Sequence, residues 1–410
     1  MNKKTVKDID VAGKRVIHRV AYDVSLEKKN GQLEVVDDLR LRVTLPTLNY
    51  LLEKNCKVIL LSWLKRPDGK VVEKWRMDPV AKRLSELIGR PVKKLDDCVG
   101  PEVEKSVSEM SPGDIIMLEN VRFHPEEMED EDNFASQLAR LGDIMVQDAF
   151  AQVHRVHASI TGIPRHIQTV AGLYLEKEVN ELSKIVHNPQ RPSVVIIGGA
   201  KVSDKIDAIN NLVKVADTIL IGGGVANDFL KAAGKDVGNS YLEDVYVDKA
   251  KKVKKDLIEI AKNLLKNERV KIPVDMIAAD KMENPKETKF INIQAGEKIP
   301  DDWMFLDIGP KTQKIYADII SKAKTIFWNG PMGVFENKLF ANGTKSITNA
   351  IAKSTNKNNS VSVIYGGETI AAIREFSAED KFTHISVAGG ATLEFIAGKK
   401  LPGIGAIIDK

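Results

Sequence analysis

The amino-acid sequence predicts an α/β protein with two parallel-sheet domains joined by a helix. Short apolar runs rich in β-branched residues alternate with amphipathic stretches along the chain, which is typical of strands and helices in a parallel sheet. Nine such runs occur in 410 residues. Nine strands are too many for one ordinary open sheet with short connections, and this length corresponds to two or three domains.

In the first half of the chain, four runs are predicted strands, and the stretches between them include two predicted helices. The strands are Val16–Val20, Val58–Ser62, Ile115–Leu118 and Ile144–Val146, and the helices are Leu45–Glu53 and Asp78–Ile88. A longer helical pattern then covers Ala171–His187 and stops at the prolines of Asn188–Pro192. We expect this pattern to be an interdomain helix.

The second half contributes five predicted strands, which are Val194–Ile197, Thr218–Ile221, Thr325–Trp328, Val361–Tyr365 and His384–Val387. The expected organisation is therefore an N-terminal domain over residues 1–170, the connecting helix over 171–187, and a C-terminal domain over 188–395, followed by a tail over 396–410.

Charge and cysteine content exclude several classes of protein. The 61 basic and 57 acidic side chains leave a formal net charge of +4. This charge is too small to indicate binding to nucleic acid or to an anionic membrane. No run approaches the ~18 apolar residues of a membrane span. Cys56 and Cys98 have no CxxC spacing, so neither a disulfide framework nor a zinc site is indicated. We expect a cytoplasmic protein without nucleic-acid or membrane partners.

Glycine follows each predicted strand of the second half. The segments are Gly198-Gly199-Ala200-Lys201, Gly222-Gly223-Gly224, Asn329-Gly330-Pro331-Met332-Gly333, Gly366-Gly367-Glu368-Thr369 and Gly389-Gly390. Ligands of open α/β sheets bind at the carboxyl ends of the strands, where glycine lets backbone N–H groups approach an oxyanion at a helix start. A single Gly-Gly pair indicates only a tight turn, but five glycine-bearing ends predict a polyphosphate site.

Lys201 and Lys205 follow the first of these glycine pairs. Neither GxxxxGK[ST] nor GxGxxG occurs, so a P-loop and a dinucleotide fingerprint are both excluded. The spacing of four predicts that the two lysines share one helix face, where they would hold phosphates while a phosphoryl group transfers.

Arginines take the corresponding places in the first half. Twelve of the 15 arginines lie in residues 1–180, whereas 30 of the 46 lysines lie after them. Four arginines flank predicted strands or helices, namely Arg40, Arg66, Arg122 and Arg155. Guanidinium forks suit phosphate and carboxylate, so these residues predict a cage for a small polyanion. His154 and His157 lack further ligands at zinc-binding spacing. One half would thus hold a nucleotide and the other a small anion, which implies phosphoryl transfer.

The motifs resemble those of the phosphoglycerate kinase family, in the same order and over essentially the whole chain. They are Gly13–Val16, Asp37–Arg40 with Leu45–Thr47, Leu64–Pro67, Leu118–His124, Asp148–Phe150 with His154–Ser159, Gly198–Ile206, Ile221–Gly224, Leu306–Thr312, Trp328–Glu336 and Gly398–Gly403. The resemblance implies two Rossmann-like domains in a bilobal hinge kinase, with the tail returning to the N-terminal domain. It also implies reversible transfer between MgATP and the carboxylate of 3-phosphoglycerate, giving ADP and 1,3-bisphosphoglycerate.

The resemblance also implies roles for individual residues. Catalytic positions are Arg40, Lys201, Lys205, Gly367 and Gly390, and substrate-binding positions are Asp23, Arg40, Trp63, Arg66, Arg122 and Arg155. Nucleotide-binding positions are Gly199, Lys201, Lys205, Gly222, Gly223, Asn329, Pro331, Glu336, Gly366, Gly367, Glu368 and Thr369, with Glu368 also expected to serve Mg²⁺. ATP or ADP with Mg²⁺ and small-molecule substrates are the implied partners, and the chain is expected to be a monomer.

Several positions depart from the family pattern. Ala21 and Asp23 stand where the family has Asp and Asn, Trp63 and Lys65 replace His and Gly, and other departures are Gln147, Ala151, Phe305, Tyr365, Glu368, Val387 and Ala388. These changes affect positions where the family recognises its two substrates. The charged residues that the resemblance assigns to phosphoryl transfer are retained. Three interpretations therefore stay open: a divergent enzyme for the same acid, a kinase for another phosphorylated aldonic acid, and a nucleotide-binding protein without catalytic activity.

Overall fold

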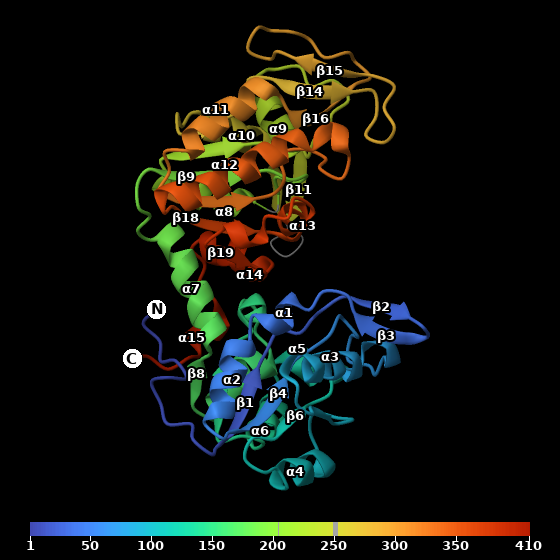
Figure 1. Cartoon of the computed structure of the whole chain (residues 1–410), viewed down its shortest axis with the longest axis vertical. Helices are drawn as coiled ribbons and strands as arrows, with labels where there is room; N and C mark the ends of the chain where they lie inside the picture. The colour runs from blue at the N-terminus through green and yellow to red at the C-terminus, as the bar shows by residue number, and fades with distance from the viewer. Residues whose placement is uncertain (204, 249–252) are drawn as a thin grey trace. The chain divides into compact units, whose positions relative to one another are not determined.

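Two six-stranded parallel sheets form within the residues that this computed structural model describes, which are 1–203, 205–248 and 253–410 (Figure 1). One sheet belongs to a unit made of Met1–Asn180 and Lys400–Lys410, here the acid unit. The other belongs to a unit made of Glu181–Lys399, here the nucleotide unit. The predicted α/β class with two parallel sheets is confirmed.

The sheet of the acid unit has the strand order β5-β6-β4-β1-β7-β8, with every neighbouring pair parallel. Its strands are β1 (Arg15–Arg19), β4 (Lys57–Leu61), β5 (Lys93–Lys94), β6 (Ile115–Met117), β7 (Ile144–Gln147) and β8 (Thr169–Ala171). Val16 pairs with Val58 on one side and with Ile144 on the other. The four predicted strands of this half form the centre of the sheet.

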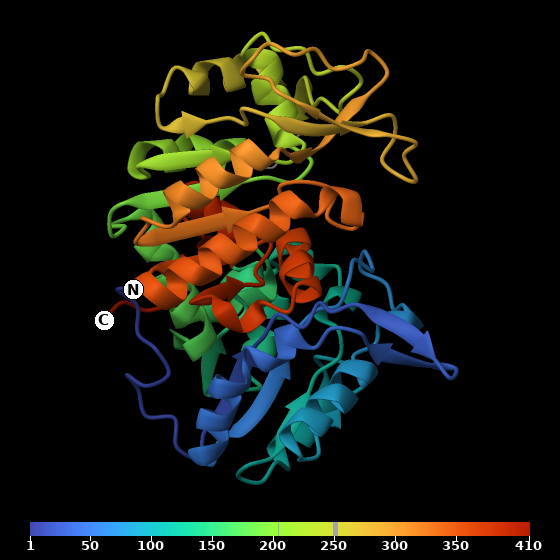
Figure 2. The same ribbon diagram turned by 45° about the horizontal axis from the view of Figure 1, so that its top comes forward.

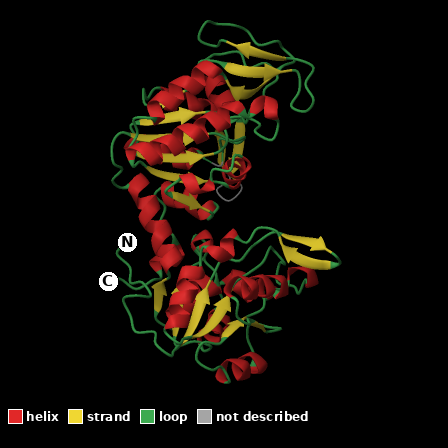
Figure 3. Ribbon diagram, viewed as in Figure 1, coloured by secondary structure: helices red, strands yellow, loops and turns green. Residues whose placement is uncertain are grey.

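Side chains of successive strand residues enter two different cores, because strand side chains alternate between faces. Val16 and Val58 pack with α2 (Leu45–Glu53) and α3 (Asp78–Ile88). Ile17 and Ile59 pack with α4 (Pro101–Ser108) and α6 (Asp132–Ala139). Helices therefore cover both faces, as Figure 3 shows, which explains why the strands read as continuous apolar runs.

Shorter elements complete the acid unit. They are the hairpin β2 (Leu26–Lys29) and β3 (Gln32–Val35), the helices α1 (Leu39–Arg42), α5 (Glu126–Glu129) and α15 (Pro402–Gly405), the 3-10 turn Val121–Phe123, and the π-helical turn Ala158–Gly162. The two chain ends meet in this unit, where Lys3 pairs with Asp409 in an isolated antiparallel bridge.

The sheet of the nucleotide unit has the strand order β13-β10-β9-β17-β18-β19, again with parallel neighbours. Its strands are β9 (Ser193–Ile197), β10 (Thr218–Ile221), β13 (Val270–Lys271), β17 (Thr325–Asn329), β18 (Val361–Tyr365) and β19 (His384–Ser386). All five strands predicted for this half are present. Helices α11 (Pro310–Ile320) and α12 (Asn342–Asn358) share a core with this sheet, and the orange helices of Figure 2 show them lying along it.

Further elements of this unit are α8 (Ile206–Val215), α9 (Val225–Ala232), α10 (Leu257–Leu265), α13 (Gly367–Glu375), α14 (Gly390–Ile396), the hairpin β11 (Val245–Asp248) and β12 (Val253–Asp256), and the antiparallel strands β14 (Met276–Ala279), β15 (Thr288–Ile291) and β16 (Met304–Ile308). Helix α7 (Leu173–Val186) begins in the acid unit and ends in the nucleotide unit, since the units divide between Asn180 and Glu181. No helix in the described ranges is both long and apolar enough to cross a membrane.

Candidate functional sites

The five predicted strands of the nucleotide unit are parallel, so their glycine-bearing carboxyl ends share one edge of the sheet. Two cavities open at this edge. The first, of about 420 Å³, is lined by Gly199, Ala200, Lys201, Gly223, Gly224, Asn227, Tyr241, Met282, Met304, Phe305, Leu306, Pro331, Gly333, Val334, Glu336 and Glu368. The second, of about 450 Å³, is lined by Ala200, Lys201, Lys205, Asn329, Gly330, Tyr365, Gly366, Gly367, Glu368, Thr369 and Leu393.

The two cavities differ in chemistry and share part of their lining. Methionine and aromatic side chains give the first an apolar wall that suits a nucleoside base. Two lysines and the N-terminus of α13 give the second a positive lining that suits phosphates. Ala200, Lys201 and Glu368 belong to both linings. A nucleotide with its base in the first cavity would therefore reach the second with its phosphates.

A positive φ and close contacts explain glycine at two of these strand ends. Gly199 has φ +78°, and a Cβ there would lie 2.6 Å from Nζ of Lys205. Gly330 has φ +92°, and a Cβ there would lie 2.3 Å from the carbonyl group of Gly198. Backbone cannot yield as a flexible side chain can, so Gly330 is needed for the loops after β9 and β17 to touch.

The expectation that Lys201 and Lys205 share one helix face is wrong. Helix α8 begins at Ile206, and Lys205 is its N-cap residue, so both lysines lie in the preceding loop. In this loop, the Glu243 carboxylate accepts hydrogen bonds from the backbone N–H and hydroxyl of Ser203 at 2.8 and 2.6 Å. Lys201 is exposed, whereas Lys205 is buried and its Nζ donates to the Gly198 carbonyl.

Glu368 lies in the first turn of α13 and lines both cavities. A single carboxylate beside a phosphate-binding helix N-terminus fits Mg²⁺, which is usually held by one or two carboxylates together with substrate phosphates. Thr369 has a structural role as well, because its hydroxyl accepts from Gly330 N–H and donates to the Tyr365 carbonyl, both at 2.8 Å.

Two of the predicted nucleotide-site glycines line neither cavity. A Cβ at Gly222 would lie 2.5 Å from Sδ of Met332, so this glycine allows close packing, and Gly390 is the first residue of α14. Sequence reasoning missed most of the apolar lining, which includes Tyr241, Met282, Met304, Leu306 and Val334. These residues come from the antiparallel strands and loops of this unit, which carry no phosphate-binding signal.

In the acid unit, the structure brings the predicted arginines into one electrostatic cluster. Arg122 is buried in the 3-10 turn after β6, with Nη1 donating to the Lys65 carbonyl at 2.9 Å. Burial lowers the pKa of Arg122, and the nearby charges of Arg155 and Arg66 lower it further, whereas Glu127 and Asp23 raise it. Mutual repulsion of this kind is offset when an anion binds among the arginines.

Arg40 joins this cluster through Asp23. The Arg40 guanidinium donates from Nη1 to the Asp23 carbonyl at 2.6 Å, and the Asp23 carboxylate accepts from the Lys65 backbone N–H at 3.0 Å. Asp23 therefore lies between the catalytic candidate and the loop that carries Trp63, Lys65 and Arg66. All six predicted acid-site residues belong to this one connected group.

Trp63 is buried, with only 3% of its surface exposed, and its ring is covered by cations. The guanidinium carbons of Arg122 and Arg19 lie 3.9 and 4.5 Å from the ring centroid. Burial lowers the pKa of Arg19 to about 9, while the charge of Glu127 opposes that shift. Sequence reasoning had not included Arg19, because it falls inside the predicted strand Val16–Val20, whereas in the structure it is the last residue of β1.

His154 responds to the same cluster. Burial is the main cause that lowers the pKa of His154 to about 4, and the charges of Arg155, His157 and Arg122 lower it further. Its imidazole is therefore neutral near pH 7, and its protonation is opposed by the cations that would bind the anion.

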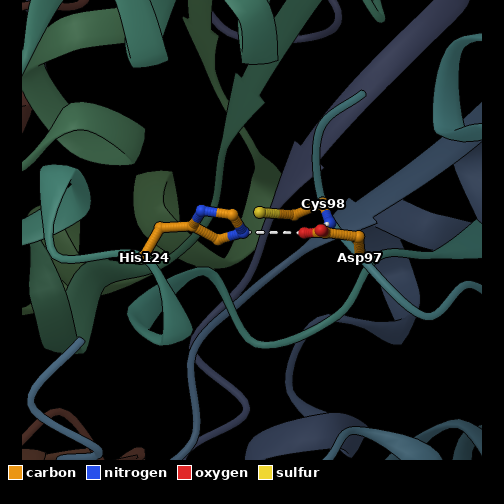
Figure 4. Close-up of side chains that lie close together, drawn as sticks. All are labelled: Asp97, Cys98 and His124. Atoms are coloured by element: carbon orange, nitrogen blue, oxygen red, sulfur yellow. Dashed lines mark hydrogen bonds and ion pairs between the residues drawn. The ribbon is translucent and has the colours of Figure 1, made fainter. Parts of the chain in front are cut away.

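Asp97, Cys98 and His124 form the group in the described residues whose atoms lie close enough to share a metal ion (Figure 4). Asp97 Oδ1 already accepts from His124 Nε2 and from the Cys98 backbone N–H, both at 2.7 Å. The hydrogen bond to Asp97 raises the pKa of His124, and burial raises that of the Cys98 thiol well above its usual range. An ion pair over a protonated thiol is a poor metal site, so we assign the group to holding the Asn120–His124 turn in place.

A glycine-rich edge with base and phosphate cavities in one α/β unit, and an arginine cluster in another, define a phosphotransferase of the two-domain α/β class. The family model described as phosphoglycerate kinase matches residues 6–399. Phosphoglycerate kinases from Pelotomaculum thermopropionicum and Dictyoglomus turgidum are 46% and 47% identical to this chain, with complete coverage of both partners in each case. The solved structure of phosphoglycerate kinase from Coxiella burnetii has a TM-score of 0.84 at 35% identity, covering 98% of each chain. The chain belongs to the phosphoglycerate kinase family.

Proposed function

We propose that the described sites carry out reversible phosphoryl transfer between MgATP and the carboxylate of 3-phosphoglycerate. A carboxylate oxygen of the acid attacks the γ-phosphorus, a new P–O bond forms, and the bond to the departing ADP breaks. The products are ADP and 1,3-bisphosphoglycerate. Membership of the phosphoglycerate kinase family supports this reaction. The observation that carries the assignment of the site is that Lys201 and Glu368 line both the apolar and the phosphate cavity.

For the nucleotide, we assign the base and ribose to the first cavity, with Pro331 and Glu336 at its wall and Asn329 in the adjoining lining. The phosphates would meet Gly199, Gly223, Gly366 and Gly367 together with the two lysines. Glu368 would hold Mg²⁺, which screens the phosphate charges when bound. Because Lys201 is exposed at the junction of the cavities, we assign it to the transferring phosphoryl group, and Lys205 to the phosphates nearer its carbonyl partner Gly198.

For the acid, we assign the phosphate group to Arg66, Arg122 and Arg155 and the reacting carboxylate to Arg40, with Asp23 aligning Arg40 through its carbonyl. The transferring phosphoryl group is loosely bonded in its transition state, so positioning and charge neutralisation are sufficient. No side-chain nucleophile or general base is required, because the attacking carboxylate is already ionised.

We also propose that the protein works as a monomer in the cytoplasm without a nucleic-acid partner. The nearly balanced charge supports the last point, and the two free, buried cysteines suit a reducing compartment. The proposed domains are residues 1–170 for the acid, 188–395 for the nucleotide, a connecting region at 171–187 and a tail at 396–410. The boundary between the acid unit and the nucleotide unit falls within α7, and Lys400–Lys410 belongs to the acid unit, which supports this organisation.

A coupled assay tests the function. Purified protein, MgATP and 3-phosphoglycerate are combined with glyceraldehyde-3-phosphate dehydrogenase, and loss of NADH is followed. We expect NADH loss that requires all three components and stops when EDTA removes Mg²⁺. In parallel, ADP release is measured with 3-phosphoglycerate and with longer phosphorylated aldonic acids. ADP release with only a longer acid, or with none of them, would contradict the proposal.

A further inference from the structure

Arg122 is a buried cation held without a close anionic partner. Only 9% of its surface is exposed, and among the described residues no carboxylate forms an ion pair with it within 4 Å. Its Nη1 donates to a neutral carbonyl, that of Lys65, and its buried Nε has no hydrogen-bond partner there. A buried guanidinium is costly unless its charge and its N–H groups are satisfied. The protein thus leaves part of the charge and hydrogen-bonding capacity of this guanidinium unsatisfied.

The Trp63 ring supplies one of the two contacts that fix this guanidinium. At 3.9 Å from the ring centroid, the Arg122 cation lies where the attraction of an indole is strong, and burial strengthens that attraction. The ring is itself fixed, because Arg19 lies 4.5 Å from it and the His157 ring lies 5.2 Å away. Since its surface is covered by these groups, Trp63 acts on a bound anion through Arg122.

Lys65 supplies the other contact through its backbone. It has φ +60°, a conformation that non-glycine residues rarely adopt, and its carbonyl accepts from Arg122. Asp23 holds the turn in this conformation, since its Oδ1 accepts from the Lys65 N–H at 3.0 Å and lies 3.7 Å from Lys65 Nζ. Backbone strain that the surroundings maintain is often found at functional sites.

We propose that Trp63 and the Lys65 backbone are positioning residues that preset the orientation of Arg122 for the phosphate group of the acid. This inference rests on the proposed function. The ring restrains the plane of the guanidinium, and the carbonyl restrains its rotation within that plane. Arg122 is therefore ordered before the anion arrives, and less conformational entropy is lost on binding.

Steady-state kinetics of Trp63→Leu and Trp63→Phe test the proposal. We expect Trp63→Leu to raise KM for 3-phosphoglycerate about tenfold while KM for MgATP stays within twofold of the wild type. Trp63→Phe keeps an aromatic ring and should raise KM for 3-phosphoglycerate about threefold. Trp75→Phe is the matched control: its ring contacts Lys74 at 5.2 Å instead of Arg122, so both KM values should stay unchanged. Circular dichroism checks that each variant is folded.

A double-mutant cycle separates positioning from a general loss of structure. In an Arg122→Lys background, which replaces the planar fork by an ammonium group, Trp63→Leu or Trp63→Phe should raise KM for the acid no further. Additive effects, or equal rises in both KM values, would overturn the proposal; if Trp63→Leu does not fold, the cycle with Trp63→Phe decides. A wild-type protein that does not phosphorylate 3-phosphoglycerate would instead refute the proposed function.

Discussion

The nucleotide unit builds its anion site from backbone, whereas the acid unit builds its own from side chains. Strand ends in the nucleotide unit carry glycine, and the loops after β9 and β17 approach so closely that a Cβ at Gly330 would lie 2.3 Å from Gly198 backbone. Strand ends in the acid unit carry arginines, and the charges of Arg155 and Arg66 add to the effect of burial in lowering the pKa of Arg122. Backbone N–H groups come into place with the fold, but guanidinium groups need further partners to hold them.

Those further partners lie around the arginines of the acid unit. Glu127 is fully buried, its carboxylate accepts from Ser159 N–H and Oγ at 2.8 and 2.6 Å, and its charge favours the cationic forms of Arg19 and Arg122. Trp63 and the Lys65 carbonyl fix Arg122 without adding negative charge. A side-chain anion site thus depends on neutral contacts, because anionic partners at close range would compete with the substrate.

The largest effect is expected for a substitution in the nucleotide unit, which removes one of the two lysines that line its phosphate cavity. Lys201→Ala should lower kcat by about 10²–10³-fold, a typical loss for one group that stabilises charge in the transition state, while KM for MgATP changes less than about fivefold. The reason is that Lys201 lies at the junction of the two cavities, where its charge would act on the transferring group. Steady-state kinetics with both substrates measure the split.

Lys322→Ala is the matched control for Lys201→Ala. Lys322 is exposed and lies between α11 and β17, at the amino end of the strand and therefore at the opposite sheet edge. Its replacement should leave kcat unchanged. Equal losses in kcat and MgATP affinity for Lys201→Ala would show that this lysine serves only in binding.

A smaller effect is expected for Glu368→Gln, namely a rise of about tenfold in the Mg²⁺ concentration that gives half the maximal rate. An amide is a weaker Mg²⁺ ligand than a carboxylate, so the Mg²⁺ concentration for half-maximal rate should rise while KM for 3-phosphoglycerate is unchanged. Glu375→Gln changes the exposed last residue of the same helix and should alter neither value. A Mg²⁺ requirement that is the same in Glu368→Gln and the wild type would remove Glu368 from the metal site.

Sequence reasoning found the strand ends of both units for a physical reason. Buried parallel strands are continuous apolar runs, and residues after them meet at one edge. The predicted central strands were therefore found, as were helices α2 and α3 with the same bounds. The short edge strands β5 and β13, with two residues each, and the antiparallel strands β14–β16 were missed. Strands of two residues give no comparable apolar signal, and β15 is exposed at three of its four residues.

Contacts between distant residues could not be predicted from sequence. Spacing placed Lys201 and Lys205 on a helix, but Glu243, far along the chain, holds Ser203 in a loop. Likewise, the sequence placed Trp63 at the substrate site but did not show that Arg19 and Arg122 lie over its ring. Side-chain packing of this kind follows from the folded arrangement, whereas local patterns report only which element a residue belongs to.

The smallest expected effect contrasts the pH dependence of the two units. The pKa of His154 is lowered to about 4, against about 6.5 in an unfolded chain. Between pH 6.5 and 4 the unfolded chain therefore takes up the proton first, and His154 makes the free energy of unfolding fall as the pH falls. In the nucleotide unit, burial raises the pKa of Asp307 to about 7, although N–H groups of Gly343 and Ile308 oppose the shift.

Asp307 gives the opposite slope. Between pH 4 and 7 the folded state holds the Asp307 proton more tightly than the unfolded chain does, so the free energy of unfolding falls as the pH rises. Urea unfolding of His154→Gln and Asp307→Asn between pH 4.5 and 7 measures both slopes. Relative to the wild type, His154→Gln should gain stability as the pH falls and Asp307→Asn as it rises. Differences that do not vary with pH would contradict both assignments.

Bound acid should change only one of these slopes. The phosphate of 3-phosphoglycerate would place negative charge among Arg122 and Arg155, two of the cations that lower the pKa of His154. Binding should therefore raise the pKa of His154 toward its ordinary value and reduce the pH-dependent difference between His154→Gln and the wild type. The Asp307 slope depends on burial among residues of the nucleotide unit and should persist. A His154 slope that saturating acid leaves unchanged would mean that the anion binds away from Arg122 and Arg155.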